Sequence, residues 1–364
     1  MAVPKLVDKW TVIVPVAAVV LLVLTLGRDL AGAAVAPVAL ILASAVLAAV
    51  HHAEVIAHRV GEPFGSLVLA LAVTVIEVAL IVTLMVDGGD KSASLARDTV
   101  FAAVMITCNG IVGLSLLIGS LRHGIAVFRA EGTGGALGTI ATLSTLCLVL
   151  PNFTTTAPGP EFSAPQLVFA AIAALVLYAL FVATQTVRHR DYFLPITRHG
   201  EVIDAESHAE APSLRATWAS LGLLGLALIA VVGLAKVISP TIESGVAAAG
   251  MPHAVVGVVI ALLVLLPETI AALRAARRDR VQTSLNLALG SCMASIGLTV
   301  PAVAIASYWL SGPLILGLSA THMVLLALTL VVSTLTVVPG RATPLQGGLH
   351  LAILAAYLEL AVTP

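Results

Sequence analysis

Long apolar runs recur along this chain from one end to the other, and a soluble fold cannot hide so many of them. Hydrophobic residues make up 59% of the 364 residues and charged residues 10%. Soluble domains are roughly 45–50% apolar and about 25% charged. The surroundings of most of the chain must therefore be lipid. This composition excludes a cytosolic enzyme, a nucleic-acid-binding protein and a disordered protein.

A helix needs about 20 mostly apolar residues to cross a bilayer. Charge clusters and segments rich in Pro or Gly divide the chain into eleven stretches of about this length. They are residues 11–27, 34–57, 65–86, 98–120, 135–151, 166–187, 214–238, 253–273, 282–308, 313–337 and 345–362. No stretch alternates polar and apolar residues as barrel strands do, so the sequence predicts an all-α polytopic membrane protein of about eleven transmembrane helices.

The distribution of basic residues predicts the orientation of these spans. With a cytoplasmic N-terminus, most of the 18 Lys and Arg residues fall on the cytoplasmic side. These are Lys5, Lys9, Arg59, Arg122, Arg129, Arg188, Arg190, Arg198, Arg215, Arg274, Arg277, Arg278, Arg280 and Arg341. The other side receives only Arg28, Lys91, Arg97 and Lys236. We therefore expect a multi-pass protein of the cytoplasmic membrane, with the N-terminus inside and the C-terminus outside.

A polar, acidic loop divides the predicted spans into two sets of five after a single first span. The expected organisation is an N-terminal helix (1–30), a first five-helix repeat (31–187), a cytoplasmic loop (188–213) and a second five-helix repeat (214–364). We interpret the loop as a solvated linker, with a regulatory cation-sensing loop as the alternative. Because five spans is an odd number, the second repeat must be inverted, an arrangement typical of secondary transporters.

A short motif supports this duplication. Residues 107–115 read TCNGIVGLS and residues 291–299 read SCMASIGLT, so that Cys, Gly and Leu recur at the same spacing. Each copy lies one span after a span that contains a glutamate, Glu77 in the first half and Glu268 in the second.

These two glutamates are the most informative charges of the chain. Glu77 lies near the centre of an apolar span, where a carboxylate costs about 2.5 kcal/mol or more. Glu268 follows Pro267, which removes a backbone donor and opens the helix so that carbonyls can face a cation. Carboxylates are the hard oxygen ligands that Ca²⁺ prefers, and a carboxylate buried without a partner also takes up a proton readily. We therefore interpret Glu77 and Glu268 as a site for cations and protons.

Small polar residues near these glutamates are further candidates for the site. Thr74 lies about one turn before Glu77 on the same helical face. The full candidate set for cation and proton binding is Glu77, Glu268, Thr74, Asn109 and Ser291, with Glu54, Asn286, Thr107 and Ser295 as secondary candidates. Ser115, Ser284 and Thr299 lie in the same spans.

His51, Glu54 and His58 share one helical face and suggest a different chemistry. Intramembrane metallohydrolases need His-Glu-x-x-His, but no His directly precedes Glu54. We therefore keep a metallohydrolase only as a remote alternative. A cation channel without proton coupling is the other alternative. Channels usually build their selectivity filter from several subunits, whereas this chain is internally duplicated and carries two inequivalent acidic residues.

Two segments resemble the signatures of bacterial calcium/proton and sodium/proton antiporters of the ChaA type. These belong to the cation/proton exchanger family of the cation/calcium exchanger superfamily. Residues 61–77 (GEPFGSLVLALAVTVIE) resemble the first signature, and residues 265–268 (LLPE) through 282–291 (QTSLNLALGS) resemble the second. In that family the signature glutamates bind the cation and exchange with protons, which implies these roles for Glu77 and Glu268, and a hydroxyl ligand at Ser291.

This sequence departs from the family pattern Gly-Asn-x-x-Glu. Thr74 stands where the first asparagine is expected, and Leu265 stands at the second position. The choice among Ca²⁺, Na⁺ and K⁺ therefore stays open.

Together these features predict a secondary antiporter of the bacterial inner membrane, not an enzyme. It would exchange Ca²⁺, or Na⁺ or K⁺, for protons, with Glu77 and Glu268 as the metal ligands. No cofactor is expected besides the transported ions. The expected partners are cations, protons and lipid, without nucleic acid or nucleotide, and the protein should be monomeric or weakly oligomeric.

Overall fold

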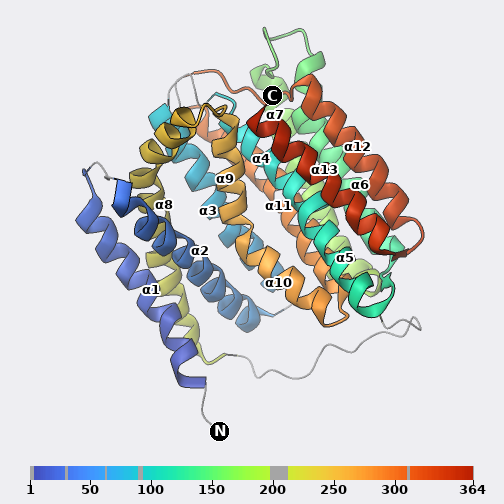
Figure 1. The fold of residues 1–364 in the computed structure, drawn as a ribbon, viewed down its shortest axis with the longest axis horizontal. Helices are drawn as coiled ribbons and strands as arrows, with labels where there is room; N and C mark the ends of the chain where they lie inside the picture. The colour runs from blue at the N-terminus through green and yellow to red at the C-terminus, as the bar shows by residue number, and fades with distance from the viewer. Residues whose placement is uncertain are drawn as a thin grey trace.

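The chain folds into a bundle of helices, seen in the computed structural model, which describes residues 4–28, 32–61, 64–88, 93–196, 212–309 and 312–363 (Figure 1). The helices are α1 (Pro4–Thr25), α2 (Gly32–Val60), α3 (Phe64–Gly88), α4 (Leu95–Met105), α5 (Val112–His123), α6 (Ala130–Ser144), α7 (Ala164–Ala183), α8 (Leu214–Ala248), α9 (Ala254–Val264), α10 (Leu266–Arg277), α11 (Val281–Ala306), α12 (Ala320–Val337) and α13 (Pro344–Val362). Strands β1 (Ala126–Val127) and β2 (Arg341–Ala342) form one antiparallel ladder. Short π or 3₁₀ turns extend several helices, namely η2 (Ile106–Ile111), η3 (Thr145–Val149), η4 (Leu150–Phe153), η5 (Thr184–Arg188) and η6 (Arg190–Phe193).

These helices confirm the predicted all-α membrane fold. Among the described residues, eight helical segments are long and apolar enough to cross a membrane, and a ninth is added if the bent pair α9–α10 counts as one span. Two further apolar helical segments, Lys9–Thr25 and Ala70–Val86, are shorter. The helices follow the predicted spans along the chain, but the number eleven and the inversion of the second repeat stay predictions.

One predicted boundary is wrong. The span expected at 313–337 begins as a helix only at Ala320. Residues before it are extended, because Ile315 forms a β-bridge with Glu161 and the Leu318 amide donates to the Leu148 carbonyl. Ser319 then caps α12 by accepting a hydrogen bond from the His322 amide at 3.3 Å.

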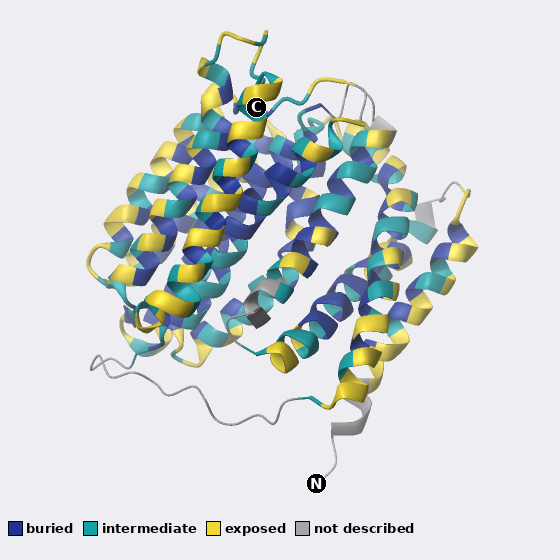
Figure 2. Cartoon of the chain, turned by 180° about the vertical axis from the view of Figure 1, so that it is seen from behind, coloured by how far each residue is buried: buried dark blue, intermediate teal, exposed yellow. Residues whose placement is uncertain are grey.

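The outer surface of the bundle is apolar. Val23, Phe169, Leu180, Ile229 and Leu335 are each more than 60% exposed, although they are large hydrophobic side chains. Figure 2 shows that such exposed positions lie on outward helix faces, while the buried residues face the interior. A surface of this kind suits the acyl chains of a bilayer.

Two large hydrophobic cores lie inside the bundle, together with a small third cluster of Ile81, Ala96 and Val303. One joins α1, α2 and α8 with one face of α3 and α9, and it includes Ala45, Leu80 and Leu234. The other joins most of the remaining helices and includes Phe101 and Met293. Helices α3 and α9 contribute to the first core, and α10 and α11 contribute to the second. Because α11 packs against both α3 and α10, these helices border the region between the two cores.

A break at Leu265 shapes this central region. Helices α9 and α10 meet there at a bend of 53°. Pro267, which cannot donate a backbone hydrogen bond, lies at the start of α10, so the predicted opening of the helix at Pro267 is confirmed. Helix α10 then turns back into α11 within three residues, where Asp279 takes a positive φ of 60°. The turn places the first helical turn of α10 beside α11.

The loop predicted at 188–213 is described only in part. Residues 197–211, with most of its acidic residues, lie outside the described residues. The first part is not fully solvated as predicted, because Phe193 is buried and its ring contacts that of Phe181 edge to face at 5.7 Å.

Candidate cation and proton site

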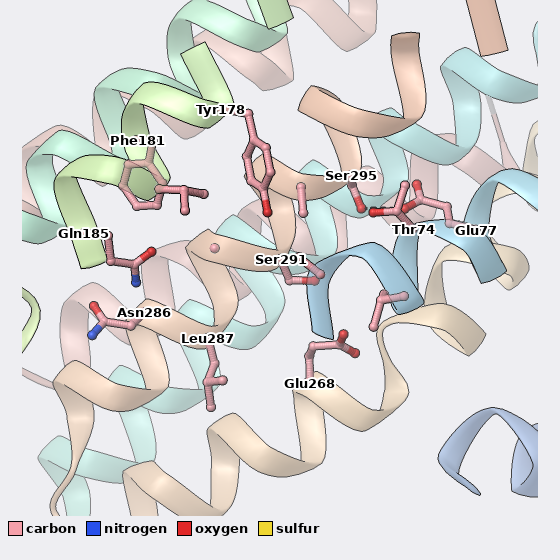
Figure 3. Close-up of a pocket in the computed structure, with 15 residues that line it drawn as sticks. Thr74, Glu77, Tyr178, Phe181, Gln185, Glu268, Asn286, Leu287, Ser291 and Ser295 are labelled. Carbon is pink, nitrogen blue, oxygen red and sulfur yellow. Dashed lines mark hydrogen bonds between the residues drawn. The ribbon is translucent and has the colours of Figure 1, made fainter. Parts of the chain in front are cut away.

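A cavity of about 120 Å³ lies between α3, α7, α10 and α11 (Figure 3). Both glutamates singled out from the sequence line it, and they come from opposite halves of the chain. Its other polar side chains are Thr74, Tyr178, Gln185, Asn286, Ser291 and Ser295. The structure therefore brings together Glu77, Glu268, Thr74 and Ser291, as expected, and adds the secondary candidates Asn286 and Ser295.

Glu77 is almost completely buried, at 2% exposure, midway along α3. Its Oε2 accepts a hydrogen bond of 2.8 Å from the Ser295 hydroxyl on α11. Its Oε1 is buried and has no hydrogen-bond partner. A buried, unpaired carboxylate oxygen is costly unless it receives a cation or a proton. Glu77 thus has one oxygen fixed by the protein and one available to a ligand.

Glu268 occupies the first turn of α10, directly after the break at Leu265. The backbone amides at a helix N-terminus favour a negative charge there. Its Oε2 is also buried without a hydrogen-bond partner. Glu268 lies within electrostatic range of both Glu77 and Glu54. Two acids in one cavity therefore each present an unsatisfied oxygen.

The cavity extends toward one end of the bundle. Its lining runs from Glu77 back to Ala70 on α3 and from Ser295 back to Asn286 on α11. It also runs forward from Tyr178 on α7 to Gln185 in η5. The cavity therefore reaches the end at which α3 and α11 begin and α7 ends. This is also the end where α1 begins, opposite the end where α13 finishes (Figure 1).

Asn109 does not line this cavity, in contrast to the prediction that it lies beside the two glutamates. Its Nδ2 donates to Thr329 Oγ1 at 2.9 Å, and its Oδ1 lies 3.2 Å from His350 Nδ1. These partners belong to α12 and α13. Asn109 lies within the π-helical turn η2, whose extra residue shifts the face that a regular helix would present. Thr107, in the same turn, is fully buried with an unpartnered Oγ1 and is also absent from the cavity lining.

Asn286 lines the outer part of the cavity, but both ends of its amide already have partners. Its Nδ2 donates to the Phe193 carbonyl at 2.6 Å, and its Oδ1 accepts from Gln282 Nε2 at 2.8 Å. Asn286 thus anchors the start of the long loop near the cavity, which makes it a weaker candidate ligand than Ser291.

Glu54 is exposed on α2 and does not line the cavity. It interacts electrostatically with His58 and Arg274. Among the described residues, no group of three or more His, Cys, Asp or Glu side chains is arranged to hold a metal ion. The His51–Glu54–His58 face therefore gives no support to a metallohydrolase.

Helix α7 and the π-helical turn η5 that continues it contribute cavity residues that the sequence did not indicate. Tyr178, Phe181 and Gln185 all line the cavity, and Gln185 and Asn286 lie near each other at its outer part (Figure 3). Tyr178 and Phe181 are three residues apart on one face of α7, and Gln185 follows in the π-helical turn η5. The sequence signal for these cavity residues was the presence of Tyr178 and Gln185 in an apolar span. This signal was weak because neither side chain carries a charge.

Comparison with known proteins places the chain in a family. The family model described as sodium/calcium exchanger protein matches residues 30–187 and 219–363. The chain belongs to the sodium/calcium exchanger protein family. It is therefore a membrane transporter that exchanges cations and not an enzyme, and the resemblance to the ChaA-type exchangers is confirmed.

Individual relatives agree with this assignment. The chain is 46% identical to the "Putative ionic transporter y4hA" of Sinorhizobium fredii, over 98% of this chain and 97% of that protein. It is 35% identical to the sodium-potassium/proton antiporter ChaA of Escherichia coli, over 86% and 85%. The structure of native YfkE superposes on this chain with a TM-score of 0.71, over 97% of this chain and 100% of the YfkE chain, at 16% sequence identity. The two proteins therefore share the fold.

Proposed function

We propose that this protein is a secondary antiporter in which Glu77 and Glu268 bind either a cation or protons. The observation that carries this proposal is the pair of buried, unpartnered oxygens, Glu77 Oε1 and Glu268 Oε2, on one cavity. A cation held there would be bound by carboxylate and hydroxyl oxygens, which are hard ligands. Thr74 and Ser291 supply the neighbouring hydroxyls.

Coupling follows from electrostatics. One divalent cation neutralises both carboxylates. When the cation leaves, two like charges remain in a cavity of low dielectric, and they repel each other. At least one carboxylate then binds a proton. Because a proton and a cation compete for the same oxygens, the site carries one or the other but not both, and the two fluxes are exchanged.

The proposed substrate is Ca²⁺, with Na⁺ or K⁺ as the alternative. Two carboxylates match the charge of a divalent ion, and YfkE is described as a Ca²⁺/H⁺ antiporter. ChaA is named for sodium and potassium and shares a higher sequence identity with this chain. In the proposed orientation the arginine-rich end of the bundle faces the cytoplasm, so the cavity would be open to the inside.

The test uses everted membrane vesicles with an imposed proton gradient. Collapse of the gradient by Ca²⁺, Na⁺, K⁺ or Mg²⁺ identifies the substrate. Glu77→Gln and Glu268→Gln keep the shape of the side chain but remove its charge, and each should abolish exchange. Glu359→Gln, at an exposed acid near the end of α13, is the matched control and should retain it.

Normal exchange by Glu268→Gln would refute the two-carboxylate mechanism and redirect the search to Glu54 and its neighbouring histidines. Cation flux without any accompanying change in internal pH would instead support a channel. Elution of each variant as a single sharp peak in size-exclusion chromatography shows that loss of exchange is not loss of folding.

A further inference from the structure

A groove with about 460 Å³ of open space lies between α6 and α12 on the outer side of the bundle. Gly134, Gly138 and Ala141 form its α6 wall, and Leu330, Thr334 and Val338 are on its α12 wall. Gly138, Thr334 and Val338 are exposed, so the groove opens to the surroundings of the protein. We refer to it as the α6–α12 groove. Figure 1 shows the two helices side by side at the edge of the bundle.

The groove exists because α6 carries glycines there. A Cβ added at Gly138 would meet no atom within 4 Å, so a larger side chain would extend into open space. The walls are otherwise apolar, and they offer dispersion contacts to a flexible hydrocarbon chain. In a bilayer the molecules that supply such chains at this surface are lipids.

Charged residues gather at one end of the groove. Glu131, in the first turn of α6, is exposed and lines it. Arg129 immediately precedes α6, and its Nε is buried without a hydrogen-bond partner. Arg341 is exposed and follows α12. The β1–β2 ladder brings these segments together, because Arg341 pairs with Val127 and the Phe128 amide donates to the Gly340 carbonyl.

These charges are not paired with each other. Within the described part of the chain the ion pair is Arg97–Asp98, which involves none of the three. Glu131 thus lines the groove, while Arg129 directly precedes the lining residue Ala130 and Arg341 follows the lining residue Val338 by three positions. They lie at the arginine-rich end of the bundle, where α6 begins and α12 ends, and so at a membrane–water interface.

We propose that the α6–α12 groove binds a phospholipid that carries both a phosphate and a primary ammonium group. The phosphate is bound by Arg129 and Arg341, since guanidinium groups match phosphate geometry. The ammonium group is bound by Glu131, and one acyl chain lies along Gly134 and Gly138. Basic pockets between membrane helices on the cytoplasmic side are suited to lipid headgroups.

The carboxylate decides which lipid fits. A purely anionic headgroup would gain from the two arginines but would be repelled by Glu131. A choline headgroup has a quaternary nitrogen without N–H, and it cannot donate a hydrogen bond to Glu131. A phosphatidylethanolamine headgroup satisfies all three side chains.

Native mass spectrometry of the purified protein tests this proposal with phosphatidylethanolamine, phosphatidylglycerol and phosphatidylcholine of identical acyl chains. We expect the strongest retention of phosphatidylethanolamine. Replacing both arginines (Arg129→Gln with Arg341→Gln) should weaken its binding about tenfold, which corresponds to ~1.4 kcal/mol. Glu131→Gln should remove the preference for phosphatidylethanolamine over phosphatidylglycerol.

Gly138→Leu tests the acyl-chain part of the site, because it fills the groove without touching the charged residues. It should abolish retention of the lipid. Gly222→Leu is the matched control, since a Cβ at Gly222 on α8 also meets no atom within 4 Å and this glycine is exposed. It should leave retention unchanged.

Three results would overturn the proposal. Retention that Gly138→Leu does not change would place the lipid elsewhere. Equal or stronger retention of phosphatidylglycerol, unaffected by Glu131→Gln, would show that the site selects only for negative charge. A dimer that Gly138→Leu converts to a monomer would show that a second copy of the chain, not a lipid, occupies the groove.

Discussion

Ser295 on α11 donates a hydrogen bond of 2.8 Å to Oε2 of Glu77 on α3, and this contact joins the two halves of the chain in the centre of the bundle. The bond fixes the orientation of the carboxylate. It leaves Oε1 buried without a hydrogen-bond partner, and the hydroxyl of Thr299, also unpartnered, lies near the carboxylate. An acid held in this way is prepared to receive a ligand without rearranging its own side chain.

Ser295→Ala should therefore weaken cation binding while leaving the fold intact. A hydrogen bond to a charged group contributes about 1.5–3 kcal/mol, so the apparent cation affinity should fall about tenfold or more. Cation titration of exchange in vesicles measures this change. Ser144→Ala is the control, because Ser144 is equally buried but bonds only its own helix, at the Ile140 carbonyl. An unchanged affinity in Ser295→Ala would mean that the orientation of Glu77 does not matter.

The network around His350 should matter for stability and not for affinity. His350 is fully buried, with Nδ1 3.2 Å from Asn109 Oδ1 and Nε2 3.2 Å from Thr336 Oγ1. Hydrogen bonds between membrane helices contribute about 0.6–1.7 kcal/mol each. His350→Ala should thus lower the free energy of unfolding by roughly 1–3 kcal/mol. Asn109→Ala should act in the same direction.

Denaturant unfolding in detergent micelles measures these losses. Thr139→Ala is the control, since the exposed Thr139 hydroxyl bonds only the Gly135 carbonyl of its own helix. A large loss of cation affinity in Asn109→Ala, with stability unchanged, would return Asn109 to the set of cation ligands.

Apolar runs predicted the helices well because in lipid a backbone must satisfy its own hydrogen bonds, so a long apolar segment has few alternatives to a helix. That Glu77 and Glu268 line one internal cavity could be predicted for a related reason, since a charge placed in an apolar span is costly unless a polar site receives it. The position of Asn109 was not predictable. A regular period of 3.6 residues cannot anticipate the π-helical turn η2, which sets the face on which Asn109 lies.

The start of α12 and the role of α7 were missed for other reasons. The apolar residues of 313–318 read as helix, yet they form extended contacts with residues far away in the sequence, at Leu148 and Glu161. Tyr178 and Gln185 gave only a weak signal because neither is charged. Long-range pairing and neutral lining residues depend on the tertiary structure and not on local pattern.

The topology predicted from the basic residues can be tested with a reporter fused to the C-terminus. Helix α1 begins at one end of the bundle and α13 finishes at the other (Figure 1). With the arginine-rich end inside, a C-terminal alkaline phosphatase should be active and a C-terminal green fluorescent protein should not fluoresce. The reverse pattern would place the C-terminus in the cytoplasm and contradict the orientation.

Deletion of residues 201–210 should leave exchange intact. This stretch lies outside the described residues, and its composition predicts a solvated linker. Changing the length of such a linker has a small entropic effect. Vesicle assays at matched protein levels measure the outcome. Loss of exchange together with normal membrane insertion would favour the alternative, a loop that senses cations.

The last prediction concerns pH. If cations and protons compete for Glu77 and Glu268, the apparent cation affinity must fall as the pH falls, because protonated carboxyl groups are poor ligands and must lose their protons before the cation binds. The affinity should change by about tenfold per pH unit for each proton displaced. Titration calorimetry in buffers of different ionisation enthalpy counts these protons directly. Glu268→Gln removes one titrating group and should reduce the count, whereas Glu359→Gln should not. A cation affinity that is independent of pH while the protein stays folded would separate cation binding from proton binding, and the exchange mechanism would then need two distinct sites.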